Sequence, residues 1–168
     1  MADRYPTKIR IGGPTKRERL AALIRAIKAE GLQSDWGSSL PDITSEEQLL
    51  EHIEDGHLTY CDEERAWGEF ADLEHFLVQE SIPFNRWHAP RYEYDGELAQ
   101  FRTGMETPAT AAVNDNEVIV IAAPEIQRIR EILKNARNME DIRKAVDELD
   151  ALCFEADIEP LPPFEITD

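Results

Sequence analysis

Residues 82–104, IPFNRWHAPRYEYDGELAQFRTG, carry the clearest local signal for the fold of this chain. Asp95 and Gly96 stand between two runs in which apolar and polar residues alternate. Asp-Gly readily adopts the positive φ angles of a two-residue hairpin turn. This turn would place Tyr94 opposite Glu97 in an antiparallel pair of strands. The buried face of the predicted hairpin consists of Tyr92, Tyr94, Ala99 and Phe101.

Strands and helices are also predicted on both sides of this hairpin. Alternating residues predict strands at 8–12 and 57–61, and the apolar run EVIVIAAP at 117–124 is typical of a central strand. Apolar residues at three- and four-residue steps predict helices, each with one face toward the core. The inward stripes of these helices are Leu20, Leu23, Ile24 and Ile27; Leu49, Leu50 and Ile53; Phe70, Leu73, Phe76 and Leu77; Ile126, Ile129, Ile132 and Leu133; and Ile142, Val146, Leu149 and Cys153.

This order of elements predicts an α+β domain. We expect a mostly antiparallel sheet, partly ferredoxin-like, with the helices packed mainly on one face. Residues 1–155 form the predicted domain, and residues 156–168 form a proline-rich acidic tail that is extended or disordered. Residues 103–116 are expected to be a loop.

The composition predicts a cytoplasmic protein. The chain has 168 residues, enough for one domain, and only two cysteines, which does not indicate a disulfide framework. The N-terminus lacks the apolar core of a signal peptide, and no apolar run approaches a membrane span. We therefore expect no membrane association.

The net charge of −17 is unevenly distributed along the chain. Residues 1–30 carry +5, whereas residues 46–75 contain eleven carboxylates and one arginine, and residues 140–168 carry −8. Such a field repels nucleic acid and anionic lipid and attracts basic surfaces. We expect the partner to be a basic protein that handles nucleic acid, and we expect no direct nucleic-acid binding.

The acidic segment supplies the candidate partner-binding residues. A helix beginning at Thr44 or Ser45 would place four carboxylates in one row, opposite its apolar side. The acids DEER at 62–65 would extend this row as a connection after the strand. The candidate residues are Glu47, Glu51, Glu54, Asp55, Asp62, Glu63 and Glu64. Trp87 and Arg86 form a second candidate, an exposed contact, because both residue types are enriched at binding hot spots.

The sequence offers no convincing catalytic, metal or cofactor motif. Gly12 and Gly13 precede a helix but lack the spacing of phosphate-binding loops. The four histidines match no zinc signature, and acids around Cys61 would suppress its reactivity. We predict no catalytic residue, no metal and no cofactor.

Crowded carboxylates on a rigid scaffold resemble, as a physical class, the DNA-mimicking inhibitors of restriction and CRISPR systems. The resemblance rests on charge and spacing, and no residue motif links the chain to a named family. It implies a non-enzymatic inhibitor that occupies a basic surface of its partner. Two alternatives remain: a regulatory or adaptor module whose acidity serves solubility, and a small metal-dependent hydrolase or nuclease.

Overall fold

The computed structural model describes residues 3–41, 43–91, 94–153 and 159–168. Its main sheet is built around β1 (Arg4–Ile11), which pairs with a strand on each side. Thr7, Ile9 and Ile11 alternate along β1 and are buried, as expected when one face of a strand meets the core. Across the sheet the strands are β3 (Ile53–Glu54), β4 (His57–Ala66), β1, β5 (Phe84–His88), β6 (Gly96–Phe101) and β7 (Ala109–Val113), and all neighbours are antiparallel.

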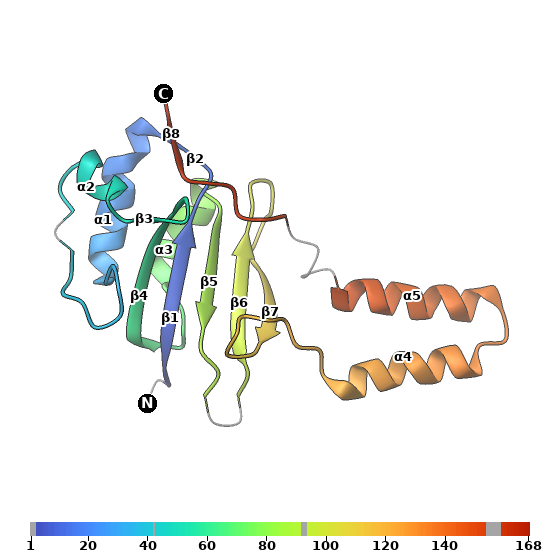
Figure 1. The fold of residues 1–168 in the computed structure, drawn as a ribbon. Coiled ribbons are helices and arrows are strands. Elements are labelled where there is room, and N and C mark those ends of the chain that lie inside the picture. The colour runs from blue at the N-terminus through green and yellow to red at the C-terminus, as the bar shows by residue number, and fades with distance from the viewer. Residues whose placement is uncertain (1–2, 42, 92–93, 154–158) are drawn as a thin grey trace.

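Two helices pack against one face of this sheet (Figure 1). α1 (Leu20–Glu30) follows a 3₁₀ turn at Arg17–Arg19, and α3 (Ala71–Gln79) packs beside it. The predicted stripe on α1 is confirmed for Leu20, Leu23 and Ile27, which are buried. The sheet and both helices share one core, which includes Ile9, Ile11, Leu58, Tyr60, Leu73, Leu77, Phe84 and Phe101.

β4 and β5 run parallel to each other, because both are antiparallel to β1 between them. α3 connects them, so β4, α3 and β5 form a split βαβ unit, which is the feature shared with ferredoxin-like folds. Two further antiparallel pairings add β6 and β7. The prediction of an α+β fold with a mostly antiparallel sheet is confirmed.

A tight Asp-Gly turn joins β3 to β4. Glu54 pairs with His57, and the two residues between them, Asp55 and Gly56, have φ angles of 49° and 83°. Positive φ at both positions is the requirement of a two-residue hairpin turn. This hairpin ends the preceding helix early, so α2 spans only Glu46–Leu50.

The predicted turn at Asp95-Gly96 is wrong. β5 pairs with β6 so that His88 lies opposite Glu97 and Arg86 opposite Ala99. The connection therefore runs from residue 89 to residue 95. Tyr94 is 61% exposed rather than buried, Ala99 and Phe101 are buried as expected, and Tyr92 lies outside the described residues.

Gly96 is needed for space rather than for a turn. A Cβ at this position would lie 2.6 Å from the carbonyl oxygen of His88. Any larger residue would push apart the paired ends of β5 and β6.

Residues 103–124 differ from the prediction in two ways. The expected loop contains β7, and the expected central strand at 117–124 makes only an isolated bridge between Ile119 and Val113. Val118 is 56% exposed. The segment lies over the edge of the sheet, where Val113 is fully buried.

The last two long helices form a hairpin that projects away from the sheet (Figure 1). α4 (Ala123–Asn135) begins with Pro124 in its first turn, as predicted. Asn138 accepts two backbone N–H groups at the start of α5 (Met139–Cys153), which confirms the predicted cap. The inward stripes predicted for both helices are largely wrong, since Ile129 is the only one of their described side chains that is buried. The side chain of Cys153 lies outside the described residues.

The described part of the C-terminal tail is extended and returns to the body. β8 (Glu165–Thr167) pairs in parallel with β2 (Pro14–Lys16), and Phe164 is buried in the core. At Gly12 a Cβ would lie 2.1 Å from the carbonyl oxygen of Pro162. Gly12 therefore allows the tail to approach the backbone closely.

Candidate functional site

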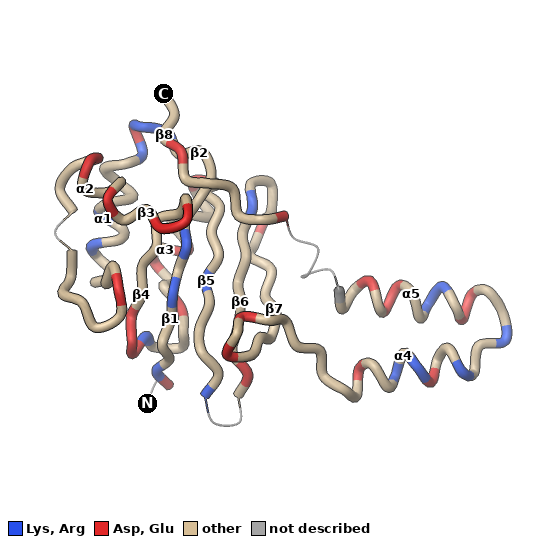
Figure 2. The backbone as a smooth tube through the Cα atoms, in the orientation of Figure 1, with Lys and Arg blue, Asp and Glu red and all other residues tan. Residues whose placement is uncertain are grey.

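Aspartate and glutamate residues gather along the β3–β4 edge of the sheet (Figure 2). A hollow of about 450 Å³ lies there, lined by three acids together with Ser34, His52, Ile53 and Thr59. The three acids are Asp35, Glu51 and Glu54. They reach the hollow from the loop after α1, from the end of α2 and from β3, respectively.

The loop that carries Asp35 also lies beside a further carboxylate, Glu63 on β4. The backbones of Gln33 and Cys61 exchange hydrogen bonds of 2.9 and 2.8 Å, which hold the loop beside β4. At Gly37 in this loop a Cβ would lie 3.7 Å from Oε1 of Glu63. We define the acidic edge as Asp35, Glu51, Glu54 and Glu63. Sequence reasoning missed Asp35 because a loop residue carries no periodic signal.

The thiol of Cys61 lies within the field of these acids. Burial, followed by the charges of Asp35, Asp62 and Glu63, raises the pKa of this thiol to about 11. The prediction that surrounding acids suppress its reactivity is consistent with this direction. The Cys61 side chain is buried, and the raised pKa disfavours its reactive thiolate form.

Some carboxylates around the acidic edge are paired with arginines, whereas those of the acidic edge are not paired with any described cation. Arg65 pairs with Glu30 and lies 3.8 Å from Asp62, and Arg17 pairs with Glu46. Between residues that the structure describes, no ion pair includes Asp35, Glu51, Glu54 or Glu63.

The predicted row of carboxylates on one helix face is wrong. α2 ends at Leu50, so Glu47 is the only candidate on it. The N–H of Glu47 and the Ser45 hydroxyl lower the pKa of the Glu47 carboxyl. Glu51, Glu54 and Asp55 continue into the turn before β3, β3 itself and the turn after it, because the β3–β4 hairpin replaces the rest of the predicted helix.

The acids at 62–64 belong to β4 and not to a connection. Successive side chains of a strand point to opposite faces, so Glu63 and Asp62 are separated by the sheet. Asp62 also accepts the backbone N–H of Glu64 at 2.9 Å. Of these three candidates, Glu63 extends the acidic edge.

Arg86 does not form the exposed contact that we predicted. It is 3% exposed and lies between two carboxylates, with Nε 3.2 Å from Glu74 and Nη2 2.7 Å from Glu97. Trp87 is half-buried on the other face, with Lys8 Nζ 5.6 Å from its ring centroid. The two side chains therefore cannot act as one surface patch.

The second acidic segment does not join the acidic edge as one surface. The acids of α5 lie on the projecting hairpin beyond β7, whereas the acidic edge lies at the opposite side of the sheet (Figure 2). Asp168 lies 3.8 Å from Arg17, which also pairs with Glu46 at the start of α2.

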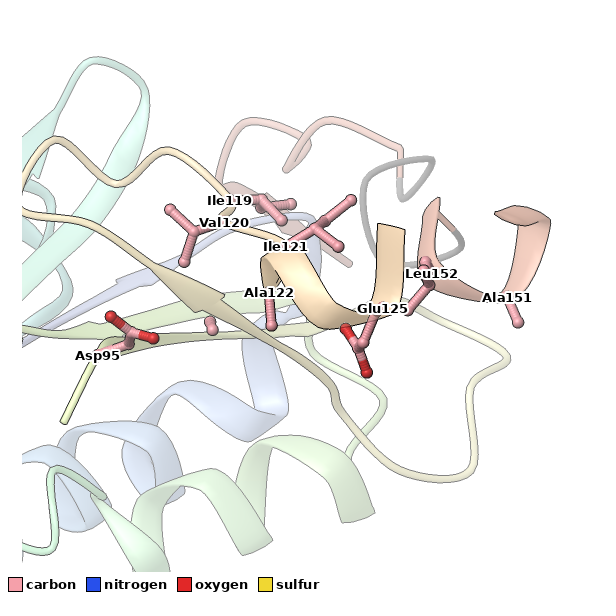
Figure 3. A pocket seen from close by; sticks show the side chains of 9 residues that line it. Asp95, Ile119, Val120, Ile121, Ala122, Glu125, Ala151 and Leu152 are labelled. Carbon is pink, nitrogen blue, oxygen red and sulfur yellow. The ribbon is translucent and has the colours of Figure 1, made fainter. Parts of the chain in front are cut away.

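A second hollow, of about 470 Å³, lies where the hairpin joins the sheet (Figure 3). Apolar side chains, including Ile121 and Leu152, line much of it. Figure 3 shows its two carboxylates, Asp95 and Glu125, apart from each other with Ala122 between them. Catalytic acids must converge on one reacting group, and these two carboxylates do not converge.

Comparisons with protein-family models, with curated proteins and with solved structures found no match to this chain. Within the described residues, no cluster of three or more histidine, cysteine, aspartate or glutamate side chains has a geometry that could hold a metal ion. None of the described helices combines the length and the apolar character needed to cross a bilayer.

Proposed function

We propose that this protein is a non-enzymatic binding protein whose acidic edge occupies a basic, nucleic-acid-binding surface of a partner protein. In this it would act as DNA-mimicking inhibitors of CRISPR and restriction systems do. The observation that carries the proposal is the set of carboxylates at Asp35, Glu51, Glu54 and Glu63, which meet along one sheet edge without ion pairs between described residues.

The proposal depends on negative charges that are attached to hydrogen-bonded strands. β3 and β4 are fixed by ladder hydrogen bonds, and β4 pairs with β1 along most of its length. Arginine and lysine form charge-assisted hydrogen bonds with carboxylates as they do with phosphates. The paired backbone fixes where Glu54 and Glu63 leave the sheet, and long-range attraction speeds the encounter with a basic partner.

A regulatory or adaptor module, with acidity that serves solubility, is the second candidate. It is favoured by the projecting helical hairpin, which exposes apolar side chains on both α4 and α5. In that function the partner would contact the hairpin, and the acidic edge would contribute only repulsion between copies.

Partner recovery from the native host separates the two candidates. The bait proteins are the wild type, an edge variant with Asp35→Asn, Glu51→Gln and Glu54→Gln, and a matched hairpin variant with Glu140→Gln, Asp147→Asn and Asp150→Asn. Each variant removes three exposed negative charges.

We expect a partner that is retained at low salt by the wild type and the hairpin variant, and is lost with the edge variant or at high salt. A partner retained equally by the edge variant would overturn the proposed function. A partner lost only with the hairpin variant would also overturn the proposed function, because it would place the contact on the hairpin.

A further inference from the structure

The α4–α5 hairpin has an apolar face that no described part of the chain covers. The two helices meet through Ile129 and Ala145, which are 5% and 1% exposed, and Arg128 pairs with Glu148 at 3.3 Å across the hairpin. Six further large apolar side chains of the hairpin are 38% to 65% exposed: Ile126, Leu133, Met139, Ile142, Val146 and Leu149.

Helix geometry places these side chains on one side of the hairpin. The four on α5 follow one another at three- or four-residue steps, and the two on α4 are two turns apart, so each set forms a stripe. Viewed down the axis of α4, its stripe is rotated by roughly a quarter turn from Ile129, and the stripe of α5 is rotated by a similar angle from Ala145. Viewed from the N-terminus of each helix, the two rotations have the same direction. Because α4 and α5 are antiparallel (Figure 1), the two stripes share a face.

The size of this face indicates an interaction surface. Two helices about 20 Å long and about 10 Å wide present roughly 400 Å² side by side. An exposed apolar patch of this size on a soluble protein marks a site of association. A lone hairpin cannot bury this face, whereas two hairpins face to face form a four-helix bundle with both stripes in its core.

The charge distribution favours a second copy of this chain as the occupant. Residues 123–153 contain six cations and seven anions, whereas the rest of the chain contains twelve cations and twenty-eight anions. Two copies therefore meet with the least repulsion through the hairpin. α4 carries a net charge of +1 and α5 of −3, so α4 of one copy and α5 of the other are complementary.

We infer that the hairpin is a self-association element, through which two copies of this chain form a four-helix bundle. The inference is independent of the proposed function. The bundle leaves the acidic edge of each copy free, because that edge lies at the opposite side of the sheet (Figure 2). The dimer would present two acidic edges to its partners and would increase their avidity.

Sedimentation equilibrium of the full chain tests this inference. The apparent mass should rise from the monomer value of 19.2 kDa toward twice that value. The rise should occur between roughly 1 and 100 µM, as expected for an interface of this small size. Val146→Lys places a charge in the apolar face, and we expect it to weaken dimerisation at least about tenfold.

Gln127→Lys is the matched control, because it adds the same charge to an exposed polar position of α4. It should leave the dissociation constant within about twofold of the wild type. Circular dichroism at monomeric concentrations should give all three proteins the same helix content. If Val146→Lys loses helix content, the milder variant Leu149→Ala replaces it as the test of the interface. Leu149→Ala should weaken dimerisation about fivefold or more.

A wild type that stays monomeric at every concentration would overturn the inference. So would a Val146→Lys dimer as tight as that of the wild type, which would place the interface elsewhere. Equal weakening by Gln127→Lys would also contradict it, because added charge alone would then explain the effect.

Discussion

Replacing Arg86 with methionine should destabilise the protein strongly, because it leaves two carboxylates without their cation. Arg86 is 3% exposed, whereas the side chains of Glu74 and Glu97 are 13% and 36% exposed. Removing one partner of a buried ion pair costs about 3–5 kcal/mol. Water screens Glu97 in part, so we expect a loss of about 3 kcal/mol at pH 7. The melting temperature should fall by about 6–12 °C.

This loss should depend on pH in a defined direction. Burial raises the pKa of Glu74 above its ordinary value of 4.5, and Arg86 opposes that rise. Without Arg86 the pKa of Glu74 rises further. A carboxyl whose pKa is higher in the folded state contributes stability at low pH, and this contribution is lost as the pH rises through the folded pKa. The deficit of the variant should therefore grow as the pH rises from the folded pKa of Glu74 in the wild type, which lies above 4.5, toward the higher folded pKa in the variant, by up to about 1.4 kcal/mol per pH unit.

Urea denaturation at pH 5 and pH 8 measures both effects. Arg19→Met is the control, since Arg19 pairs with Glu80 at 3.1 Å on the surface and its loss should cost less than about 1 kcal/mol. Adding Glu74→Gln to Arg86→Met should recover part of the loss and remove most of its pH dependence. A deficit below about 1 kcal/mol at pH 8, or an equal deficit at both pH values, would refute this reasoning.

Three further predictions concern packing, capping and thiol reactivity. Phe164→Ala should lower the free energy of unfolding by about 3–5 kcal/mol in urea denaturation, because Phe164 is 6% exposed in the core; a loss below about 1 kcal/mol would mean that the tail does not pack there. Ser45→Ala should cost about 1 kcal/mol, since Ser45 Oγ accepts the Gln48 N–H; unchanged hydrogen exchange in α2 would contradict this. Iodoacetamide at pH 8 should modify folded Cys61 roughly a hundredfold more slowly than an unfolded cysteine, by mass spectrometry; equal rates would contradict its burial and raised pKa.

The two Asp-Gly dipeptides show why sequence reasoning misplaced the hairpin turn. An Asp-Gly hairpin turn is present, but at Asp55-Gly56 rather than at Asp95-Gly96. The same dipeptide has two physical uses, since Gly56 supplies a positive φ and Gly96 supplies space beside His88. Only the tertiary pairing of β5 with β6 distinguishes them.

Apolar periodicity predicted the helices better than it predicted what covers them. The stripe of α1 meets the sheet, as expected, and so do Leu73 and Leu77 of α3. The similar stripe of α5 does not, because the chain leaves the sheet before α4 begins (Figure 1). Periodicity shows that a face is apolar, but it does not identify the surface on which that face packs.

The acidic edge was only partly predictable, because its residues are brought together by tertiary contacts. The density of acids at 46–75 drew attention to Glu51, Glu54 and Glu63, which the structure places on the acidic edge. Their grouping depends on the β3–β4 hairpin and on a backbone bridge that brings Asp35 beside them. Such long-range contacts leave no trace in local spacing.

Competition with DNA tests the central proposal most directly. The partner recovered from the host would be bound to fluorescently labelled duplex DNA and titrated with this protein. We predict that the protein displaces the DNA, and that displacement weakens steeply as salt rises from about 50 to 200 mM. The variant with Asp35→Asn, Glu51→Gln and Glu54→Gln should displace DNA at least about tenfold less effectively. A stable complex that contains the partner, the DNA and this protein together would contradict the proposal.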